Sequence, residues 1–315
     1  MRWCVTGSSG FLGGAVVRAL EGDTGVTSLV RVVRSAREAD LSTVRAIDLA
    51  RIGPEALARL WRDDAPDVVI HCAGRTPPAS TDQFWLSNTR ATAVLLEAAR
   101  RSGRRMRVVL VGSAAELGPV PASFLPVDES CPCRPRDAYG LSTWAATRLG
   151  VAGWWGGLVE VVVGRVFNLI GAGMSSSQVF GRFARTLACA EREPVELAVS
   201  DLEARRDFVD VRDVADALIA LARSGRSGSV YHIGTGHSRA IAEGLGTLIR
   251  VSGRAVRVCA AARVPTGAME SVASIEKISS EVGWVPRIGF EESLVGLWED
   301  ALERAGGGSR SRWVA

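Results

Sequence analysis

Short apolar runs alternate with helical stretches along the first half of the chain. Runs such as Val68-Val69-Ile70 and Val108-Val109-Leu110-Val111 are continuously apolar, which is typical of strands covered on both faces. On this pattern six strands are predicted, at Arg2–Thr6, Thr27–Val33, Val44–Asp48, Asp67–Cys72, Arg107–Gly112 and Val159–Arg165. Helices fit between them, starting near Phe11, Pro54, Phe84 and Ala138. The alternation predicts an α/β protein with a doubly wound parallel sheet.

The regular alternation ends after Phe167, where the segment Leu169–Ser177 is rich in glycine and serine. We therefore predict a sheet domain of residues 1–168 plus 206–235 and a smaller substrate-binding lobe of residues 169–205 plus 237–305. The glycine-rich tail, residues 306–315, is predicted to be disordered.

A glycine-rich segment, Thr6-Gly7-Ser8-Ser9-Gly10-Phe11-Leu12-Gly13, directly follows the first predicted strand and opens a helix. Glycines allow the tight turn and let the backbone approach a pyrophosphate, which the positive end of the helix then stabilises. The strand–loop–helix context makes this a dinucleotide-binding motif and the sheet domain Rossmann-like. The predicted cofactor contacts here are Gly7, Ser8, Ser9, Gly10, Phe11 and Leu12.

The end of the second predicted strand bears on the choice of nucleotide. A carboxylate at that position holds the ribose 2′-hydroxyl of NAD, whereas arginine suits the 2′-phosphate of NADP. Arg31 and Arg34 are present, and no carboxylate follows until Glu38, so the sequence favours NADP, with NAD possible. After the third strand, Asp48 and Leu49 are expected near the adenine. Cys72, Ala73 and Gly74, after the fourth strand, are expected to flank the adjacent ribose.

Composition narrows the class of protein. The 315 residues are 47% hydrophobic and 23% charged, with a mean hydropathy of +0.14, which excludes a disordered or collagen-like chain. No apolar run reaches the roughly 18 residues of a membrane span. Met1 leads at once into an apolar run and the glycine loop, so we expect no signal peptide and a cytoplasmic protein. The net charge of +4 is scattered and aromatics are only 6%, which argues against nucleic-acid binding.

Six cysteines are dispersed without a CxxC pair, so we expect free thiols and no metal site.

Six further segments accompany the glycine loop in the sequence: Val111–Gly118, Tyr139-Gly140-Leu141-Ser142, Arg165–Gly171, Leu202–Val214, Tyr231–Gly236 and Gly283-Trp284-Val285-Pro286. Taken in this order, they resemble the extended short-chain dehydrogenase/reductases, the NAD-dependent epimerase/dehydratase family. The resemblance is strongest to nucleotide-sugar enzymes of the GDP-4-keto-6-deoxy-mannose reductase type, and it covers the chain from Arg2 to about Leu297.

The resemblance implies roles for individual residues. Ser113 would hydrogen-bond the reacting oxygen, and Tyr139 would transfer a proton to or from it. Further implied cofactor contacts are Asn88, Val111, Val166 and Tyr139, and implied substrate contacts are Glu116, Asn168 and Arg206. The resemblance also implies a homodimer formed through helices around 84–101 and 138–155, where Trp144, Trp154 and Trp155 lie.

The sequence departs from the family's pattern at three positions. Thr143 stands where the family has a lysine that holds the nicotinamide ribose and lowers the tyrosine pKa, so Thr143 is the third candidate catalytic residue. Losing that cation should hinder alcohol oxidation, which needs tyrosinate, more than ketone reduction. A second diphosphate-binding arginine is replaced by Val264, beside Arg263, and Leu117 replaces a frequent tyrosine.

Three interpretations follow. The first is an NAD(P)-dependent ketoreductase acting on a 4-keto-6-deoxy nucleotide sugar or a related small keto substrate. The second is an epimerase, dehydratase or non-redox tailoring enzyme of the same fold with a non-nucleotide substrate. The third is a catalytically silent dinucleotide-binding protein. A shared fold does not decide among them.

Overall fold

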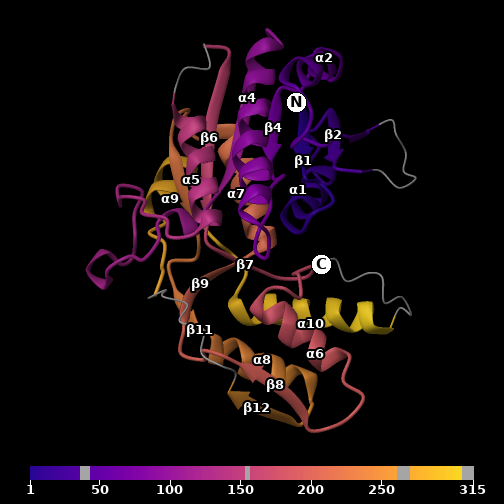
Figure 1. Cartoon of the computed structure of the whole chain (residues 1–315), viewed down its shortest axis with the longest axis vertical. Coiled ribbons are helices and arrows are strands. Elements are labelled where there is room, and N and C mark those ends of the chain that lie inside the picture. The colour runs from indigo at the N-terminus through magenta and orange to yellow at the C-terminus, as the bar shows by residue number, and fades with distance from the viewer. Residues whose placement is uncertain (36–42, 153–156, 261–269, 307–315) are drawn as a thin grey trace.

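The computed structural model describes residues 1–35, 43–152, 157–260 and 270–306, which form two lobes (Figure 1). The larger lobe is built on a parallel seven-stranded sheet with the order β10-β6-β5-β4-β1-β2-β3. Its strands are β1 (Arg2–Thr6), β2 (Ser28–Val33), β3 (Val44–Ala46), β4 (Val68–His71), β5 (Met106–Ser113), β6 (Val159–Val166) and β10 (Val230–Ile233).

Helices cover both faces of this sheet. One face carries α1 (Phe11–Glu21), α7 (Val211–Ser224) and α9 (Glu276–Val282), and the other carries α2 (Pro54–Asp64), α4 (Ala91–Arg101) and α5 (Ala138–Val151). The central strands supply apolar side chains to both layers. Val68 and Ile70 of β4 pack in the core under α1 and α7, while Val69 between them packs in the core under α2 and α4. This explains the continuously apolar runs and confirms the predicted doubly wound sheet.

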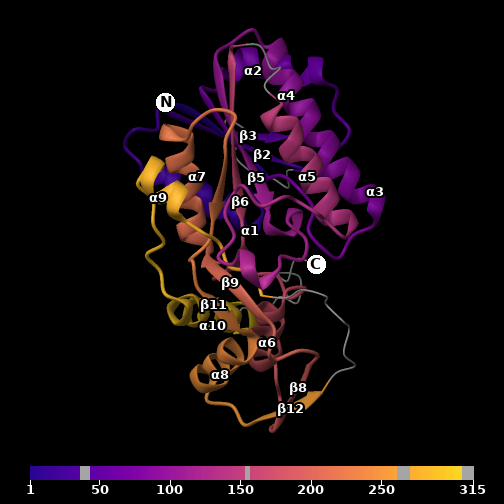
Figure 2. The same cartoon turned by 90° about the vertical axis from the view of Figure 1, so that its left-hand side faces the viewer.

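The smaller lobe lies beyond the carboxyl ends of the strands (Figure 2). It contains a three-stranded sheet of β7 (Asn168–Ile170), β9 (Arg205–Asp210) and β11 (Ser238–Ala240), and a parallel pair of β8 (Val195–Val199) and β12 (Val256–Ala260). Its helices are α6 (Val179–Ala188), α8 (Ile241–Ser252) and α10 (Phe290–Gly306). In its core the ring of Phe208 lies 5.0 Å from that of Phe180 and 5.5 Å from that of Phe290.

One side chain takes part in both cores. Phe11, the first residue of α1, packs against the apolar cluster of the larger lobe and also against that of the smaller lobe. A Cβ atom added at Gly173, in the loop after β7, would lie 3.2 Å from the Phe11 ring. The glycine loop and the smaller lobe are therefore in direct contact.

The structure divides the chain differently from the sequence at two places. β9 belongs to the smaller lobe's sheet, whereas the sequence predicts residues 206–235 in the sheet domain. The segment 276–288 returns to the larger lobe, because Asp213 of α7 holds it. The Trp284 indole donates to the Asp213 carbonyl at 3.1 Å, and the Asp213 carboxylate accepts from the backbone of Arg287 and Ile288 at 3.1 and 2.9 Å.

The helix expected near Phe84 begins earlier. It starts as α3 (Thr81–Phe84), continues as a π-helical segment, η1 (Trp85–Arg90), and runs into α4. Two short 3-10 turns, η2 (Ala114–Glu116) and η3 (Ala122–Phe124), follow β5. α10 includes Gly306, and the remainder of the predicted disordered tail lies outside the described residues. Within the described ranges no helix is long and apolar enough to cross a membrane.

Candidate functional site

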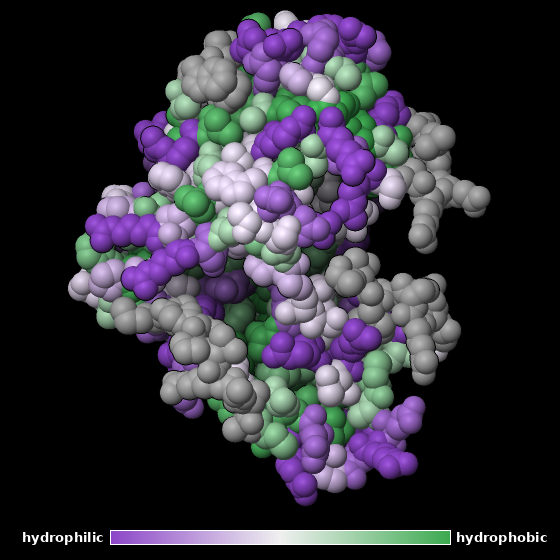
Figure 3. Space-filling view, in the orientation of Figure 1, coloured by the Kyte–Doolittle hydropathy of each residue, from purple (hydrophilic) through white to green (hydrophobic). Residues whose placement is uncertain are grey.

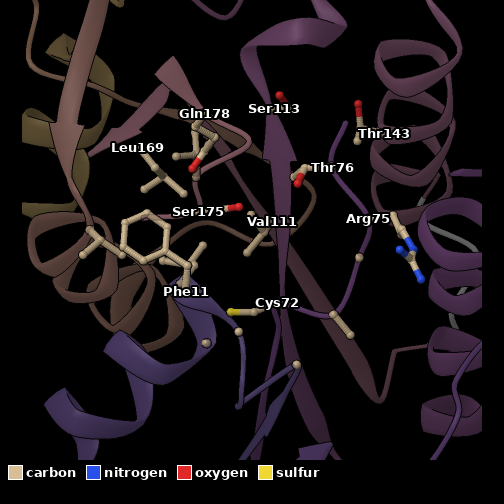
Figure 4. A pocket seen from close by; sticks show the side chains of 18 of the residues that line it. Phe11, Cys72, Arg75, Thr76, Val111, Ser113, Thr143, Leu169, Ser175 and Gln178 are labelled. Carbon is tan, nitrogen blue, oxygen red and sulfur yellow. The ribbon is translucent and has the colours of Figure 1, made fainter. Parts of the chain in front are cut away.

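A cleft of about 2490 Å³ opens between the two lobes at the carboxyl ends of the parallel strands, and Figure 3 shows the surface hollowed there. Ligands of doubly wound proteins bind at this edge of the sheet. Figure 4 shows side chains from both lobes facing the cleft. Val111, Ser113 and Cys72 come from the larger lobe, and Leu169, Ser175 and Gln178 come from segments that follow β6.

The glycine loop forms one wall of the cleft and fits a dinucleotide. Gly7 has a φ of +66°, and a Cβ there would lie 2.7 Å from the Ala73 nitrogen, so a side chain is excluded. A Cβ at Gly13 would lie 2.1 Å from the Gly7 carbonyl oxygen. Glycine at position 13 therefore lets the start of α1 pack closely against the loop. No side chain caps the N-terminus of α1, and its first turn contains no acidic residue. This terminus is therefore electrostatically suited to a pyrophosphate.

The two arginines near the end of β2 have different surroundings. Arg34 lines the cleft. Arg31 is not among the lining residues, because its guanidinium is 3.6 Å from the Glu21 carboxylate and donates to the Thr43 hydroxyl at 3.2 Å. The structure thus places Arg31 outside the predicted cofactor site. Glu38 lies outside the described residues.

Arg18 is a cleft residue that the sequence analysis missed. It lies on α1 one turn after Gly14, and a Cβ atom at Gly14 would lie 3.4 Å from the Arg18 guanidinium. The absence of a side chain at Gly14 lets Arg18 extend back toward the glycine loop. The sequence contained one signal for this position. Gly14 and Arg18 are spaced i, i+4 on the helix that follows the glycine loop, so they share one helix face.

The other predicted cofactor contacts all line the cleft: Ser8, Ser9, Gly10, Phe11, Leu12, Asp48, Leu49, Cys72, Ala73, Gly74, Asn88, Val111 and Val166. Asn88 has a bracing role as well. Its side chain accepts from the Arg75 backbone nitrogen at 2.7 Å and donates to the Ser142 hydroxyl at 2.9 Å. Asn88 lies in the π-helical segment, so it ties the loop after β4 to the helix that carries Tyr139.

Ser113, Tyr139 and Thr143 come together at the cleft. Ser113 ends β5, and Tyr139 and Thr143 share one face of α5, which begins where Asp137 accepts a hydrogen bond from the Gly140 nitrogen at 2.7 Å. Burial is the largest influence on Tyr139 and raises its pKa. A hydrogen bond with Ser113 opposes this, and the charges of Glu116 and Asp137 add to it. Tyr139 is therefore a neutral phenol at physiological pH.

Thr143 brings no charge to the site. Its hydroxyl bonds to its own helix, at 3.0 Å to the Gly140 carbonyl and 3.2 Å to the Tyr139 carbonyl. In the described part of the chain, the charges that act on the Tyr139 pKa are both carboxylates. The phenol therefore suits donation of a proton better than its removal.

The three predicted substrate contacts have different positions. Asn168 and Arg206 line the cleft, and burial lowers the pKa of Arg206. Glu116 is fully buried and is absent from the lining, so the structure does not place it against a substrate. It is held inside because its carboxylate pairs with Arg165 at 3.0 Å. Arg263 and Val264, like Trp154 and Trp155, lie outside the described residues.

Comparison with known proteins agrees with this geometry. Residues 3–234 match the NAD dependent epimerase/dehydratase family. The chain belongs to this family. It is 31% identical over 262 residues to a GDP-6-deoxy-D-mannose reductase of Pseudomonas aeruginosa, covering 78% of this chain and 84% of that protein. It is 32% identical over 343 residues to a UDP-glucose 4-epimerase of Azospirillum brasilense, covering 99% and 97%.

Among solved structures, RMD from Pseudomonas aeruginosa complexed with NADPH superimposes with a TM-score of 0.84 at 28% identity, over 96% of this chain and all (100%) of that one. The family and the Rossmann-like fold expected from the sequence are confirmed. The expected cofactor, NADP with NAD possible, agrees with the nucleotide bound to that structure and with the family's dependence on NAD.

Proposed function

We propose that the protein is an NADPH-dependent ketoreductase whose substrate is a 4-keto-6-deoxy nucleotide sugar. The observation that carries the proposal is that Ser113 and Tyr139 line the same cleft, with the uncharged Thr143 one helical turn after the phenol. Reduction of a ketone builds negative charge on its oxygen and consumes a proton, and a neutral phenol can supply that proton.

Each side chain has one task in this reaction. Reduced nicotinamide supplies the hydride when it is bound. The Ser113 hydroxyl donates a hydrogen bond to the ketone oxygen and stabilises the developing charge, and the Tyr139 phenol gives its proton to the same oxygen. Thr143 adds no cation beside Tyr139, because its neutral hydroxyl bonds to its own helix, so the phenol remains protonated in the resting site.

The anionic parts of the ligands have cationic neighbours in the cleft. Arg34 and Arg18 are suited to the 2′-phosphate of NADPH, and the partly buried Arg206, near Asn168, is suited to a substrate diphosphate. The names of the relatives, a GDP-sugar reductase and a UDP-sugar epimerase, support a nucleotide sugar.

Epimerisation is the less favoured chemistry. A 4-epimerase first oxidises an alcohol, a step in which tyrosinate removes a proton. Threonine at position 143 supplies no positive charge to stabilise tyrosinate, so the anion is costly to form, since each pKa unit corresponds to about 1.4 kcal/mol.

The test measures NADPH consumption with a panel of 4-keto-6-deoxy nucleotide sugars, using the loss of nicotinamide absorbance as the readout. Turnover that Tyr139→Phe abolishes, with NADPH affinity retained, supports the proposal. Tight NADPH binding without consumption on any keto substrate contradicts it and favours the silent dinucleotide-binding protein. Bound oxidised nucleotide that remains unchanged through turnover would instead favour an epimerase or dehydratase.

We further propose a homodimer formed through the continuous helix of η1 and α4 together with α5, since Trp85 and Leu86 of η1 and Leu141 of α5 expose apolar surface. Light scattering on the purified protein would decide between a monomer and a dimer.

A further inference from the structure

A buried chain of polar groups lies directly behind Ser113. Glu116, Arg165 and His232 are 0%, 3% and 0% exposed, and they come from the turn after β5, from β6 and from β10. Burying an ion pair is costly unless every charged atom finds a partner. The proposed reaction uses none of these three groups.

The Glu116 carboxylate joins two elements through one oxygen. Its Oε1 accepts from the Ser113 backbone nitrogen at 2.8 Å and from the Thr147 hydroxyl at 3.0 Å. Thr147 lies on α5 eight residues after Tyr139, on the same helix face. A single atom therefore links the strand end that presents Ser113 to the helix that presents Tyr139.

The second oxygen, Oε2, is held from the opposite side. It accepts from Arg165 Nε at 3.1 Å and Nη2 at 3.0 Å. Arg165 Nη1 lies 3.1 Å from His232 Nε2, and since arginine only donates, this nitrogen accepts and the ring proton is on Nδ1. Nδ1 lies 3.0 Å from the Val127 carbonyl oxygen, to which it donates. Burial and the Arg165 charge lower the pKa of His232 to about 3, so the ring is neutral.

Two glycines let neighbouring backbone pack closely around Glu116 and its turn. A Cβ at Gly112 would lie 2.6 Å from Glu116 Oε1, and a Cβ at Gly140 would lie 2.5 Å from the Ala115 carbonyl oxygen. Glycine at these two positions lets the strand, the turn and the start of α5 approach closely around the carboxylate.

We propose that Glu116 is a positioning residue, which sets the separation of the Ser113 and Tyr139 hydroxyls by binding the Ser113 backbone and Thr147 through one carboxylate oxygen. Arg165 and His232 fix the orientation of that carboxylate. The inference rests on the proposed function in one respect only, namely that Ser113 and Tyr139 act on the same substrate oxygen.

Two double variants separate the effect of the hydrogen-bond acceptor at position 116 from the effect of the charges on Glu116 and Arg165. Glu116→Gln with Arg165→Met keeps an acceptor at Oε1, and Glu116→Leu with Arg165→Met removes it. Both pairs are neutral and similar in volume, and replacing Arg165 avoids a stranded buried charge. Thermal unfolding first establishes that each variant folds. Thr147→Val, which leaves the ion pair intact, tests the same oxygen if a double variant does not fold.

With NADPH and the keto substrate, the kcat of the Leu variant should be about 10²-fold lower than that of the Gln variant. A loss of this size is expected when a reacting group is misplaced by about 1 Å. The KM for NADPH should be the same in both variants. Thr147→Val should also lower kcat, without a change in the KM for NADPH. Equal kcat in the Leu and Gln variants, or wild-type kcat in Thr147→Val, overturns the proposal.

A readout without turnover distinguishes this failure from failure of the proposed function. The chain has only 2 tyrosines, so ¹³C labelling of the tyrosine ring gives two signals, which Tyr231→Phe assigns. The Ser113 amide resonance and the Tyr139 signal should both move on going from the Gln to the Leu variant. If they do not move, Glu116 does not position either group. If they move and even the wild type reduces no keto sugar, the positioning stands and the proposed function fails.

Discussion

Charged side chains at the nucleotide end of the cleft and those buried behind its other end, where Ser113 lies, are held in opposite ways. At the nucleotide end, Arg18 and Arg34 are exposed, and the described residues offer neither of them an acidic partner. Behind Ser113, Glu116 and Arg165 are buried and their charged atoms are bonded to one another and to their neighbours. The exposed arginines are therefore available to a ligand, whereas the buried pair stabilises the arrangement of the strand, turn and helix around Ser113.

The largest effect is expected where the two ends meet, at the reacting groups. Tyr139→Phe should lower kcat by about 10³-fold, and Ser113→Ala by about 10²-fold, because in the proposed reaction each hydroxyl acts on the ketone oxygen. Steady-state kinetics beside a titration of NADPH binding measures this. A loss of NADPH affinity as large as the loss of kcat would contradict the assigned roles.

Two buried histidines should show themselves in the pH dependence of stability. His71 ends β4, where its Nδ1 lies 2.7 Å from the Thr6 hydroxyl, and His232 belongs to the buried chain behind Ser113. Burial lowers the pKa of His71 to about 4 and, with Arg165, that of His232 to about 3, from an ordinary 6.5. Below pH 6.5 the unfolded chain binds protons that the folded protein excludes, so the free energy of unfolding should fall. The expected slope is about 1.4 kcal/mol per pH unit for each histidine.

Urea unfolding from pH 7 down to the folded-state pKa values measures this slope, and His71→Gln should reduce it by about half. A free energy of unfolding that stayed level below pH 6.5 would mean that these histidines are not excluded from protonation.

The open end should show itself in the choice of nucleotide. Arg34→Ser should weaken NADPH binding by about 10- to 100-fold, the value of a charge-assisted hydrogen bond, and leave NADH binding nearly unchanged. Arg31→Ser is the matched control, since Arg31 is paired with Glu21 outside the cleft. Calorimetric titration of both nucleotides decides, and equal losses in the two variants would remove Arg34 from the site.

The smallest expected effect comes from adding a positive charge beside Tyr139, at position 143, where threonine supplies none. Thr143→Lys should lower the pKa of Tyr139 by about one unit, because an ammonium group beside the phenol stabilises tyrosinate. Alcohol oxidation should gain more than ketone reduction, and the alkaline limb of the pH–rate profile should move to lower pH. No change in the ratio of the two rates would show that Tyr139 does not respond to charge at position 143.

Sequence reasoning worked best where the chemistry is local. The bounds of β1 are as predicted and those of β5 are extended by one residue at each end, since an apolar run between a loop and a helix defines a buried strand. The two-residue period of a strand could also have shown that Arg31 and Arg34 point in different directions. Arg31 and Arg34 are three residues apart, so an extended chain points them to opposite faces and they could not both meet the nucleotide.

The position of Glu116 could not be predicted in this way. Its neighbour Ser113 is three residues away, but the partner that draws it inside, Arg165, is 49 residues distant and on another strand. A polar residue beside a reactive serine suggests a ligand contact, and only the packing of β6 against β5 shows that its carboxylate faces inward. The place of Asn88 in the cleft was predicted, but its hydrogen bonds with Arg75 and Ser142 were not, because they depend on the direction that a π-helical turn gives its side chain.

The double packing of Phe11 limits how this protein can be taken apart. Because its ring lies in both apolar cores, the nucleotide loop ends on a residue that the smaller lobe helps to hold in place. A protein engineer who exchanged that lobe to obtain a new substrate range would also be redesigning the support of the phosphate-binding turn. The two lobes are not interchangeable modules, and any chimaera has to carry over the residues around Gly173 that meet this ring.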